Sequence, residues 1–265
     1  MHSTLAPPPA ASDASLDLQP HVDEFLERGF TVIPNVLTPE QVELGKQLLT
    51  DLFEREKTVA QKHGWRNATY QCCYMLPGKH EFFRKLPLNP RTLGFVRKIL
   101  GDDCILSSLN GLTMAPGGPN QVLHLDQPEH TPGIVININA THTLDDFTRE
   151  NGATRIVPAS HLRSGRNRDF AGEEGHTIQI EAPAGSLIAF NGGAILAGSA
   201  NRTDKLRRCL HAYYTRAWAK PQWDFKRSLP SEIVAQMNDD EKRLYGFQSM
   251  EQVYDLNTNE VRRYG

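Results

Sequence analysis

The sequence lacks the features that mark several large classes of protein. Lys and Arg number 29 against 31 Asp and Glu, so the formal net charge is −2 and no basic excess favours nucleic acid or an anionic membrane. No apolar run approaches the roughly 20 residues that a membrane-spanning helix needs. We therefore expect a protein that binds neither nucleic acid nor membrane.

Cysteine is also scarce. The chain has four, Cys72, Cys73, Cys104 and Cys209, and no two of them form a C-x-x-C pair. A structural zinc site and a disulfide framework are therefore not expected, and a cytoplasmic location is the default. The first residues combine no basic start with an apolar stretch, so we do not expect a secretory signal.

Length and composition predict one folded unit behind a short tail. With 265 residues and 39% hydrophobic residues, the chain suffices for a large domain with a single core. Residues 1–18 are rich in Pro and Ala and predict a disordered tail. Residues 19–265 contain no repeat and no linker, so we expect them to form a single domain.

The apolar spacing changes along the chain. Residues 20–28, 39–64 and 90–100 have helical spacing, and the second of these opens with Thr38-Pro39 and a Gln placed to complete a capping box. From Cys104 onward, eight short apolar runs alternate with Gly, Pro and Asn clusters. That spacing is typical of a sandwich or barrel such as a jelly roll, so the predicted class is mainly β (α+β).

One of these runs, Q-V-L-H-L-D-Q, carries an H-x-D pair. His124 and Asp126 lie two residues apart on a predicted strand, so both side chains point to the same face. An imidazole and a carboxylate on one face suit non-heme Fe(II), where a second histidine completes a 2-His-1-carboxylate site. Alone the pair is a weak signal, because two polar residues also meet by chance on a solvated strand.

Two further stretches strengthen this interpretation. Glu150–His161 reads E-N-G-A-T-R-I-V-P-A-S-H, and Gly29–Val42 reads G-F-T-V-I-P-N-V-L-T-P-E-Q-V. Together with H-x-D, they resemble the phytanoyl-CoA dioxygenase family of Fe(II)/2-oxoglutarate oxygenases over roughly residues 25–215. The resemblance implies a double-stranded β-helix, or cupin-like jelly roll, with helices packed on one face. It also implies a monomer or homodimer that uses Fe(II), 2-oxoglutarate and O₂ to oxidise a small organic metabolite, as in natural-product biosynthesis.

The distal histidine of that family is missing. The family pattern ends in H-G-x-x-x-N, and aligning back from Asn201 puts the histidine at Leu196 or at Ala197, depending on a one-residue gap. Neither side chain can bind a metal. We place it at Ala197, where the stretch reads A-G-S-A-N in place of H-G-S-A-N; alanine is also the residue that an experimenter would install to disable such a site. Three explanations stay open: an engineered knock-out, natural loss, and an atypical site with two ligands.

The resemblance also implies where 2-oxoglutarate binds. The family holds its far carboxylate with an arginine about eleven residues beyond the distal histidine, and a planar guanidinium suits that role. Counting from Ala197 gives Arg208, and counting from Leu196 gives Arg207. We prefer Arg208, because its face also carries Leu210 and Ala212. Further contacts to 2-oxoglutarate are expected from Gln121, Thr154 and Arg66.

Other polar residues near these motifs receive plainer interpretations. His211 lies on the strand face opposite Arg208, and we expect it to be packed or exposed and not to ligate. His161 is expected to hold a turn, and His130 lies in a loop that could face substrate. The composition of the loops expected to line the pocket predicts a partly apolar substrate; the residues are Trp65, Tyr70, Met75 and Phe170.

Two functions follow from this reading. The first is an Fe(II)/2-oxoglutarate-dependent dioxygenase that hydroxylates, desaturates or rearranges a small metabolite. The second is a descendant that kept the barrel and lost the iron, acting as an isomerase, a binding protein or an inactive partner subunit. A purely structural module is disfavoured, because buried polar groups without partners are costly in a barrel.

Overall fold

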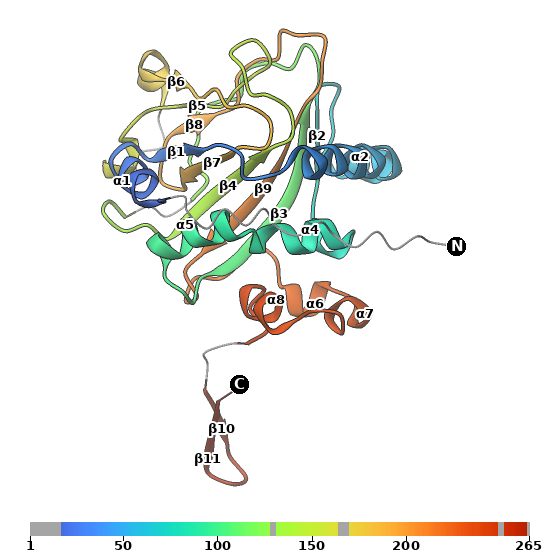
Figure 1. Cartoon of the computed structure of the whole chain (residues 1–265), viewed down its shortest axis with the longest axis vertical. Coiled ribbons are helices and arrows are strands. Elements are labelled where there is room, and N and C mark those ends of the chain that lie inside the picture. The colour runs from blue at the N-terminus through green and yellow to red at the C-terminus, as the bar shows by residue number, and fades with distance from the viewer. Residues whose placement is uncertain (1–16, 128–130, 164–169, 249–251, 264–265) are drawn as a thin grey trace.

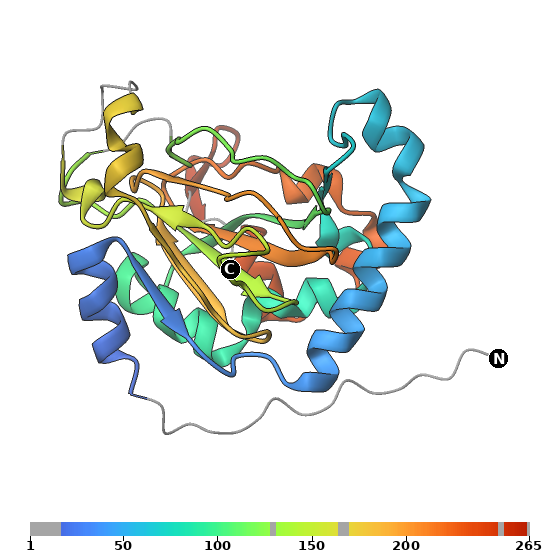
Figure 2. The ribbon, with the colours of Figure 1, turned by 90° about the horizontal axis from the view of Figure 1, so that it is seen from above.

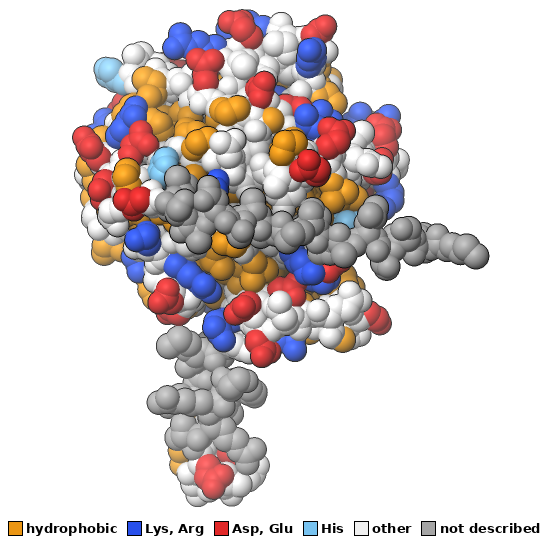
Figure 3. Space-filling view, in the orientation of Figure 1, with side chains coloured by type: hydrophobic (Ala, Val, Ile, Leu, Met, Phe, Trp, Pro, Cys, Tyr) orange, Lys and Arg blue, Asp and Glu red, His pale blue; other side chains and the backbone are white. Residues whose placement is uncertain are grey.

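The computed structural model describes residues 17–127, 131–163, 170–248 and 252–263. Most of the tail predicted for residues 1–18 therefore lies outside the described residues, while Leu18 itself packs against the main core. Within the described ranges, no helix is both long and apolar enough to cross a bilayer. Acidic and basic side chains interleave on the face of the molecule in Figure 3.

Two antiparallel sheets form the body of the protein (Figure 1). The larger has six strands in the order β1-β7-β4-β9-β3-β2, and the smaller has three in the order β6-β5-β8. The strands of the body are β1 (Phe30–Ile33), β2 (Tyr70–Cys73), β3 (Ile105–Met114), β4 (Asn137–Thr143), β5 (Arg155–Ile156), β6 (Ile178–Gln179), β7 (Leu187–Asn191), β8 (Leu196–Ala197) and β9 (Arg207–Thr215). A separate hairpin, β10 (Gln252–Asp255) with β11 (Glu260–Arg263), projects from the body.

Helices pack against one face and the edges of the large sheet. Figure 2 shows α1 and the long α2 at opposite edges of the β core. The α-helices are α1 (Gln19–Arg28), α2 (Pro39–Arg55), α3 (Lys57–Lys62), α4 (Glu81–Lys85), α5 (Pro90–Leu100), α6 (Phe225–Ser228), α7 (Ser231–Val234) and α8 (Asp239–Leu244). Short 3₁₀ helices occur at η1 (Leu76–Gly78), η2 (Leu86–Leu88), η3 (Ser160–Leu162) and η4 (Ala171–His176).

Local signals in the sequence account for several helix ends. The predicted capping box is present at α2, where the Thr38 hydroxyl accepts from the Gln41 amide and the Gln41 side chain accepts from the Thr38 amide. The helix ends at Arg55 and does not continue to Gly64 as expected. After Glu56 the chain forms a separate short helix, α3. Helix α1 ends at Gly29, whose φ of 84° is the left-handed conformation that favours glycine.

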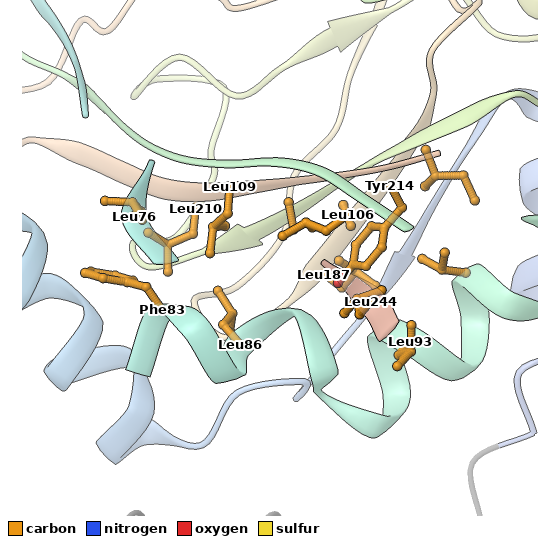
Figure 4. Packing of buried hydrophobic residues seen from close by; sticks show 14 of the residues in the cluster. Leu76, Phe83, Leu86, Leu93, Leu106, Leu109, Leu187, Leu210, Tyr214 and Leu244 are labelled. Carbon is orange, nitrogen blue, oxygen red and sulfur yellow. The ribbon is translucent and has the colours of Figure 1, made fainter. Parts of the chain in front are cut away.

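Strand β9 lies at the centre of the large sheet and separates two environments. Its even-numbered residues Leu210, Ala212 and Tyr214 pack in the core beneath the helices, as Figure 4 shows for Leu210 and Tyr214. Its odd-numbered Cys209 packs in a second cluster that contains residues of both sheets, so this cluster lies between them. We call these two sides of the large sheet the helix face and the barrel face.

The strands differ from the sequence expectation in two places. The predicted strands C-I-L-S-S-L and G-L-T-M-A are one continuous strand, β3, with a bulge between Leu106 and Ser108. The predicted strand through His124 is reduced to an isolated bridge, in which His124 pairs with Leu196 of β8. The small sheet therefore extends to the H-x-D motif through this one residue pair.

A buried ion pair fastens the C-terminal helices to the body. The Nε atom of Arg84 on α4 donates to the Glu241 carboxylate on α8 at 2.8 Å, and the side chains are 5% and 2% exposed. The Tyr245 hydroxyl also donates to the Arg84 carbonyl at 2.8 Å. These contacts join residues more than 150 positions apart, so they hold the chain end in place.

We expect Glu241→Gln to lower the free energy of unfolding by about 3 kcal/mol, because the buried Arg84 charge loses its carboxylate. The matched control is Glu81→Gln, since the Glu81 side chain is 50% exposed and lies 3.8 Å from the same guanidinium. That change should alter stability by less than about 0.5 kcal/mol. Urea unfolding of both variants measures the difference, and equal losses would contradict the assignment.

His142 predicts a dependence of stability on pH. Burial lowers the pKa of His142 to about 4, and its Nε2 atom lies 2.9 Å from the Thr92 hydroxyl. The unfolded chain binds this proton near pH 6.5, so stability is lost as the pH falls from about 6.5 towards 4. His142→Gln should reduce the slope of unfolding free energy against pH by up to about 1.4 kcal/mol per pH unit in that window.

The control for this measurement is His176→Gln, whose side chain is 72% exposed. It should leave the slope as it is in the parent protein. A slope that is the same in the parent and in His142→Gln would show that His142 takes up its proton equally in both states.

Candidate active site

His124 is held in an orientation that suits a metal ligand. Its Nδ1 atom lies 2.9 Å from the Val122 carbonyl, which can only accept, so Nδ1 carries the proton. The lone pair is then on Nε2, which lies 3.6 Å from Oδ1 of Asp126. The H-x-D motif therefore brings one nitrogen and one oxygen donor together, as its spacing predicted.

Asp126 is oriented by a neighbouring amide on the large sheet. Its Oδ2 atom accepts a hydrogen bond from Asn139 Nδ2 at 2.9 Å, and the same amide nitrogen lies 3.2 Å from Nδ1 of His211. The Asn139 oxygen in turn accepts from Thr141 at 3.3 Å. One amide group thus fixes the carboxylate of Asp126 and the ring of His211.

The residue on the ligand face of β8 is Leu196. Leu196 is the bridge partner of His124, and residues directly opposite in an antiparallel pair share a face. Its side chain is 7% exposed and packs with Ile156 and Cys209 between the two sheets.

Ala197, which the sequence analysis preferred as the ligand position, is fully buried on the other face, in a cluster with Leu123. We therefore correct the position of the missing histidine to Leu196. The alignment without a gap is the one that fits this geometry, and no alanine stands at the ligand position.

The donor set fits two protein ligands and does not complete the 2-His-1-carboxylate site. Leucine has no donor atom, and no cluster of three or more His, Cys, Asp or Glu side chains occurs in the described part of the chain. His211 therefore does not replace the missing histidine.

The paired arginines lie on opposite faces of β9. Arg208 is on the helix face, where its Nε and Nη2 atoms donate to the Asp145 carboxylate at 2.9 and 3.0 Å. Arg208 shares its face of β9 with Leu210 and Ala212, as predicted. That face packs against the helices and not inside the barrel. This preference is therefore corrected: Arg207 is the arginine on the barrel face.

Arg207 is a buried guanidinium without a carboxylate partner in the described ranges. The side chain is 7% exposed, Nη1 donates to the Gly152 carbonyl, and the guanidinium carbon lies 4.5 Å from the centre of the Phe147 ring. Its Nε atom is buried without a hydrogen bond, and burial lowers the pKa of Arg207. A buried unpaired charge is costly, so the group is suited to an anionic ligand.

The other predicted cofactor contacts are divided between the two faces. Gln121 accepts from the Gly198 amide at 2.8 Å, on the segment next to His124. Thr154 directly precedes β5, and strand alternation puts it on the barrel side with Ile156. Arg66 pairs with Gln71, whose side chain bonds to the Phe53 carbonyl of α2, so strand pairing puts Arg66 on the helix face.

A pocket of about 580 Å³ opens beside Asp126. Of the residues expected around it, Tyr70 lines the pocket, whereas Met75 packs in the main core and Phe170 packs beside the cluster of Ala197. The lining combines tyrosine rings and aliphatic groups with polar side chains. It consists of Tyr70, Cys72, Tyr74, Ser107, Ser108, Asn110, Leu112, Asp126, Ile136, Asn137, Asn139, His211, Tyr213, Thr215, Ala219, Lys220 and Gln222.

Sequence reasoning missed His211 and Tyr213 as pocket residues. His211 and Tyr213 follow Arg207 and Cys209 as the odd-numbered residues of β9, which face the barrel. The correct choice of arginine would therefore have located them. His161 lies in η3 with its Nε2 atom 2.9 Å from the Leu26 carbonyl, in the turn predicted for it. His130, also considered as a substrate contact, lies outside the described residues.

Comparisons with known proteins bear on the family and the fold. The family model described as phytanoyl-CoA dioxygenase (PhyH) matches residues 25–209. The dioxygenase af480 of Aspergillus fumigatus is 25% identical, with 88% of this chain and 78% of that protein covered. The Fe(II)/2-oxoglutarate-dependent dioxygenase nvfF of Aspergillus novofumigatus is 27% identical, with 85% and 80% covered.

A solved structure confirms the predicted jelly-roll fold. The epimerase SnoN, in complex with Fe³⁺, α-ketoglutarate and nogalamycin RO, superposes with a TM-score of 0.65 at 18% identity. The alignment covers 84% of this chain and 92% of that one. The family match spans both sheets, the H-x-D motif and the start of β9. The chain therefore belongs to the phytanoyl-CoA dioxygenase family.

Proposed function

We propose that this chain is a 2-oxoglutarate-dependent oxygenase that oxidises a small organic substrate with iron bound by only two protein ligands. His124 and Asp126 are the proposed ligands, and Arg207 is the proposed anchor for 2-oxoglutarate. The observation that carries the proposal is the buried guanidinium of Arg207, which has no carboxylate partner in the described ranges. Relatives named as Fe(II)/2-oxoglutarate-dependent dioxygenases support it.

Iron, when bound, would supply the activation of O₂ that couples oxidation of 2-oxoglutarate to oxidation of the substrate. The protein's own residues orient the reactants. His124 offers Nε2, Asp126 offers a carboxylate oxygen, and Asn139 keeps that carboxylate turned towards the histidine. The hydrogen bonds of His124 with the Val122 carbonyl and of Asp126 with Asn139 are of the kind that orients side chains for metal binding.

Arg207 would hold the far carboxylate of 2-oxoglutarate. Its buried position strengthens a charge-assisted hydrogen bond, because little water competes for the guanidinium. Gln121 and Thr154 are proposed to contribute further polar contacts. The oxo-acid end of 2-oxoglutarate carries donor oxygens of its own, which would offset part of the affinity lost with the third protein ligand.

Leu196 favours a second candidate function, a family member that no longer uses iron. A buried leucine at the ligand position removes a nitrogen donor and adds apolar surface in its place. In this case the pocket and Arg207 would bind a diacid and a small molecule without oxidising either.

We propose for both candidates a cytoplasmic protein that acts as a monomer or homodimer, and its four buried free cysteines suit a reducing compartment.

Leu196→His distinguishes the two candidates. The new imidazole would share a face with His124 and complete the three-ligand set, so Fe(II) affinity should rise at least about 10-fold. The matched control is Ala197→His, because Ala197 faces away from the pair. Anaerobic Fe(II) titration and succinate formation from 2-oxoglutarate, measured for the parent and both variants, give the comparison.

The proposed two-ligand enzyme requires the parent protein to form succinate with added Fe(II). Succinate formation by Leu196→His alone would support the iron-free candidate. If Ala197→His raised Fe(II) affinity as much as Leu196→His, the assignment of the ligand face would be wrong.

Arg207→Met tests the diacid anchor independently of iron. Loss of a buried charge-assisted contact should weaken 2-oxoglutarate binding at least about 30-fold in calorimetric titration. Without ligand, Arg207→Met should be no less stable than the parent, because it removes an unpaired buried charge. Arg208→Met is the control: it leaves Asp145 with less compensation and lowers stability, but 2-oxoglutarate affinity should be unchanged. The reverse pattern would refute the choice of Arg207.

A further inference from the structure

We infer that the pocket binds a hydroxyl-rich, sugar-like substrate through the hydroxyl of Tyr213 and the amide oxygen of Asn137. The inference names a substrate class for the proposed function and rests on it for the place of the chemistry. Both residues line the pocket beside Asp126. They lie on the neighbouring strands β9 and β4. Tyr213 pairs with Asn139 and Asn137 pairs with Thr215, so Tyr213 and Asn137 are diagonal neighbours on the same face.

The two polar atoms are buried and have no partner in the described part of the chain. Asn137 is 8% exposed, and both its Oδ1 atom and the Tyr213 hydroxyl are buried without a hydrogen bond. Leaving such groups unpaired costs about 1–3 kcal/mol each. The cost is relieved if a bound molecule supplies the missing hydrogen bonds.

Gly192 brings these two atoms to one place. A Cβ atom built on Gly192 would lie 1.7 Å from Asn137 Oδ1 and 2.9 Å from the Tyr213 hydroxyl oxygen. The absence of a side chain at Gly192 therefore lets an acceptor and a hydroxyl converge. Burial raises the pKa of Tyr213 well above its usual range, and the charge of Asp126 raises it further, so the hydroxyl stays protonated as a donor.

An acceptor and a donor at one point match an alcohol, because a hydroxyl group donates one hydrogen bond and accepts others. The rest of the lining extends the match, since Ser108, Asn110 and Thr215 also present side chains that both donate and accept. An apolar substrate would leave Tyr213 and Asn137 unpaired. A site built in this way rejects analogues that lack the hydroxyl.

The volume of the pocket agrees with a substrate of this class. Sites for small organic ligands commonly measure about 300–1,000 Å³, and this pocket measures about 580 Å³. A monosaccharide or disaccharide unit is therefore of suitable size. The position of Asp126 in the lining places such a unit next to the proposed metal ligands.

Calorimetric titration of the full chain tests the inference, with methyl α-D-glucoside, myo-inositol and sucrose as hydroxyl-rich probes. Cyclohexanecarboxylate and decanoate are the apolar probes. At least one hydroxyl-rich probe should bind, and Tyr213→Phe should weaken it by about 3- to 10-fold, the effect of one lost hydrogen bond. The same variant should be no less stable than the parent, because it removes a buried hydroxyl that has no partner.

Tyr214→Phe is the matched control. Tyr214 is the next residue on β9, but it lies on the helix face, where its hydroxyl donates to the Pro87 carbonyl at 2.8 Å. Tyr214→Phe should therefore lower stability and leave probe affinity unchanged. Gly192→Ala provides a second variant, which keeps both polar groups but displaces the Asn137 oxygen, and it should also weaken the probe.

Three outcomes would overturn the inference: no hydroxyl-rich probe binds, the apolar probes bind more tightly, or Tyr213→Phe and Gly192→Ala leave affinity unchanged. Binding is measured without iron or 2-oxoglutarate turnover. Failure of the proposed oxygenase function would show instead as absent succinate formation with normal probe binding, so the two failures are distinguishable.

Discussion

Side-chain alternation along β9 is the constraint on which the site depends. The strand is paired on both sides, with β3 and with β4, so its register is fixed at nearly every residue. Because consecutive side chains point to opposite faces, a fixed register decides which arginine and which tyrosine face the barrel. One register therefore places both Arg207 and Tyr213 on the barrel face. A slip of one residue would put Arg208 and Tyr214 on that face instead.

The same rule explains how much of the site could be predicted from the sequence. The H-x-D pair needs only local geometry, since residues two apart on an extended segment share a face. The jelly-roll fold and the family followed from several motifs in order. The choice between Leu196 and Ala197 depends on the bridge between His124 and β8, a contact between residues far apart in the chain. No local pattern specifies that contact.

The choice of Arg208 failed for a different physical reason. Apolar neighbours predict a position inside the barrel, but the large sheet is covered on both faces. Leu210 packs under the helices and Cys209 packs between the sheets, and both are buried. In a sheet covered on both faces, hydrophobicity does not distinguish one interior from the other. The ion pair of Arg208 with Asp145, which does distinguish them, joins distant segments.

Leu196 offers no donor atom, yet polar contacts hold the side chains of the proposed metal site in place. Asn139 still orients Asp126, the Val122 carbonyl still fixes the tautomer of His124, and Arg207 is still buried without a carboxylate in the described ranges. Arg207 and the Tyr213 hydroxyl lower stability when no ligand is bound, because in the described part of the chain the charge has no carboxylate partner and the hydroxyl has no hydrogen bond. A fold optimised for stability alone would carry apolar groups of similar size in place of Arg207 and the Tyr213 hydroxyl. Their presence is best explained by ligands that pair with them, and this explanation holds for a diacid and an alcohol whether or not iron is bound.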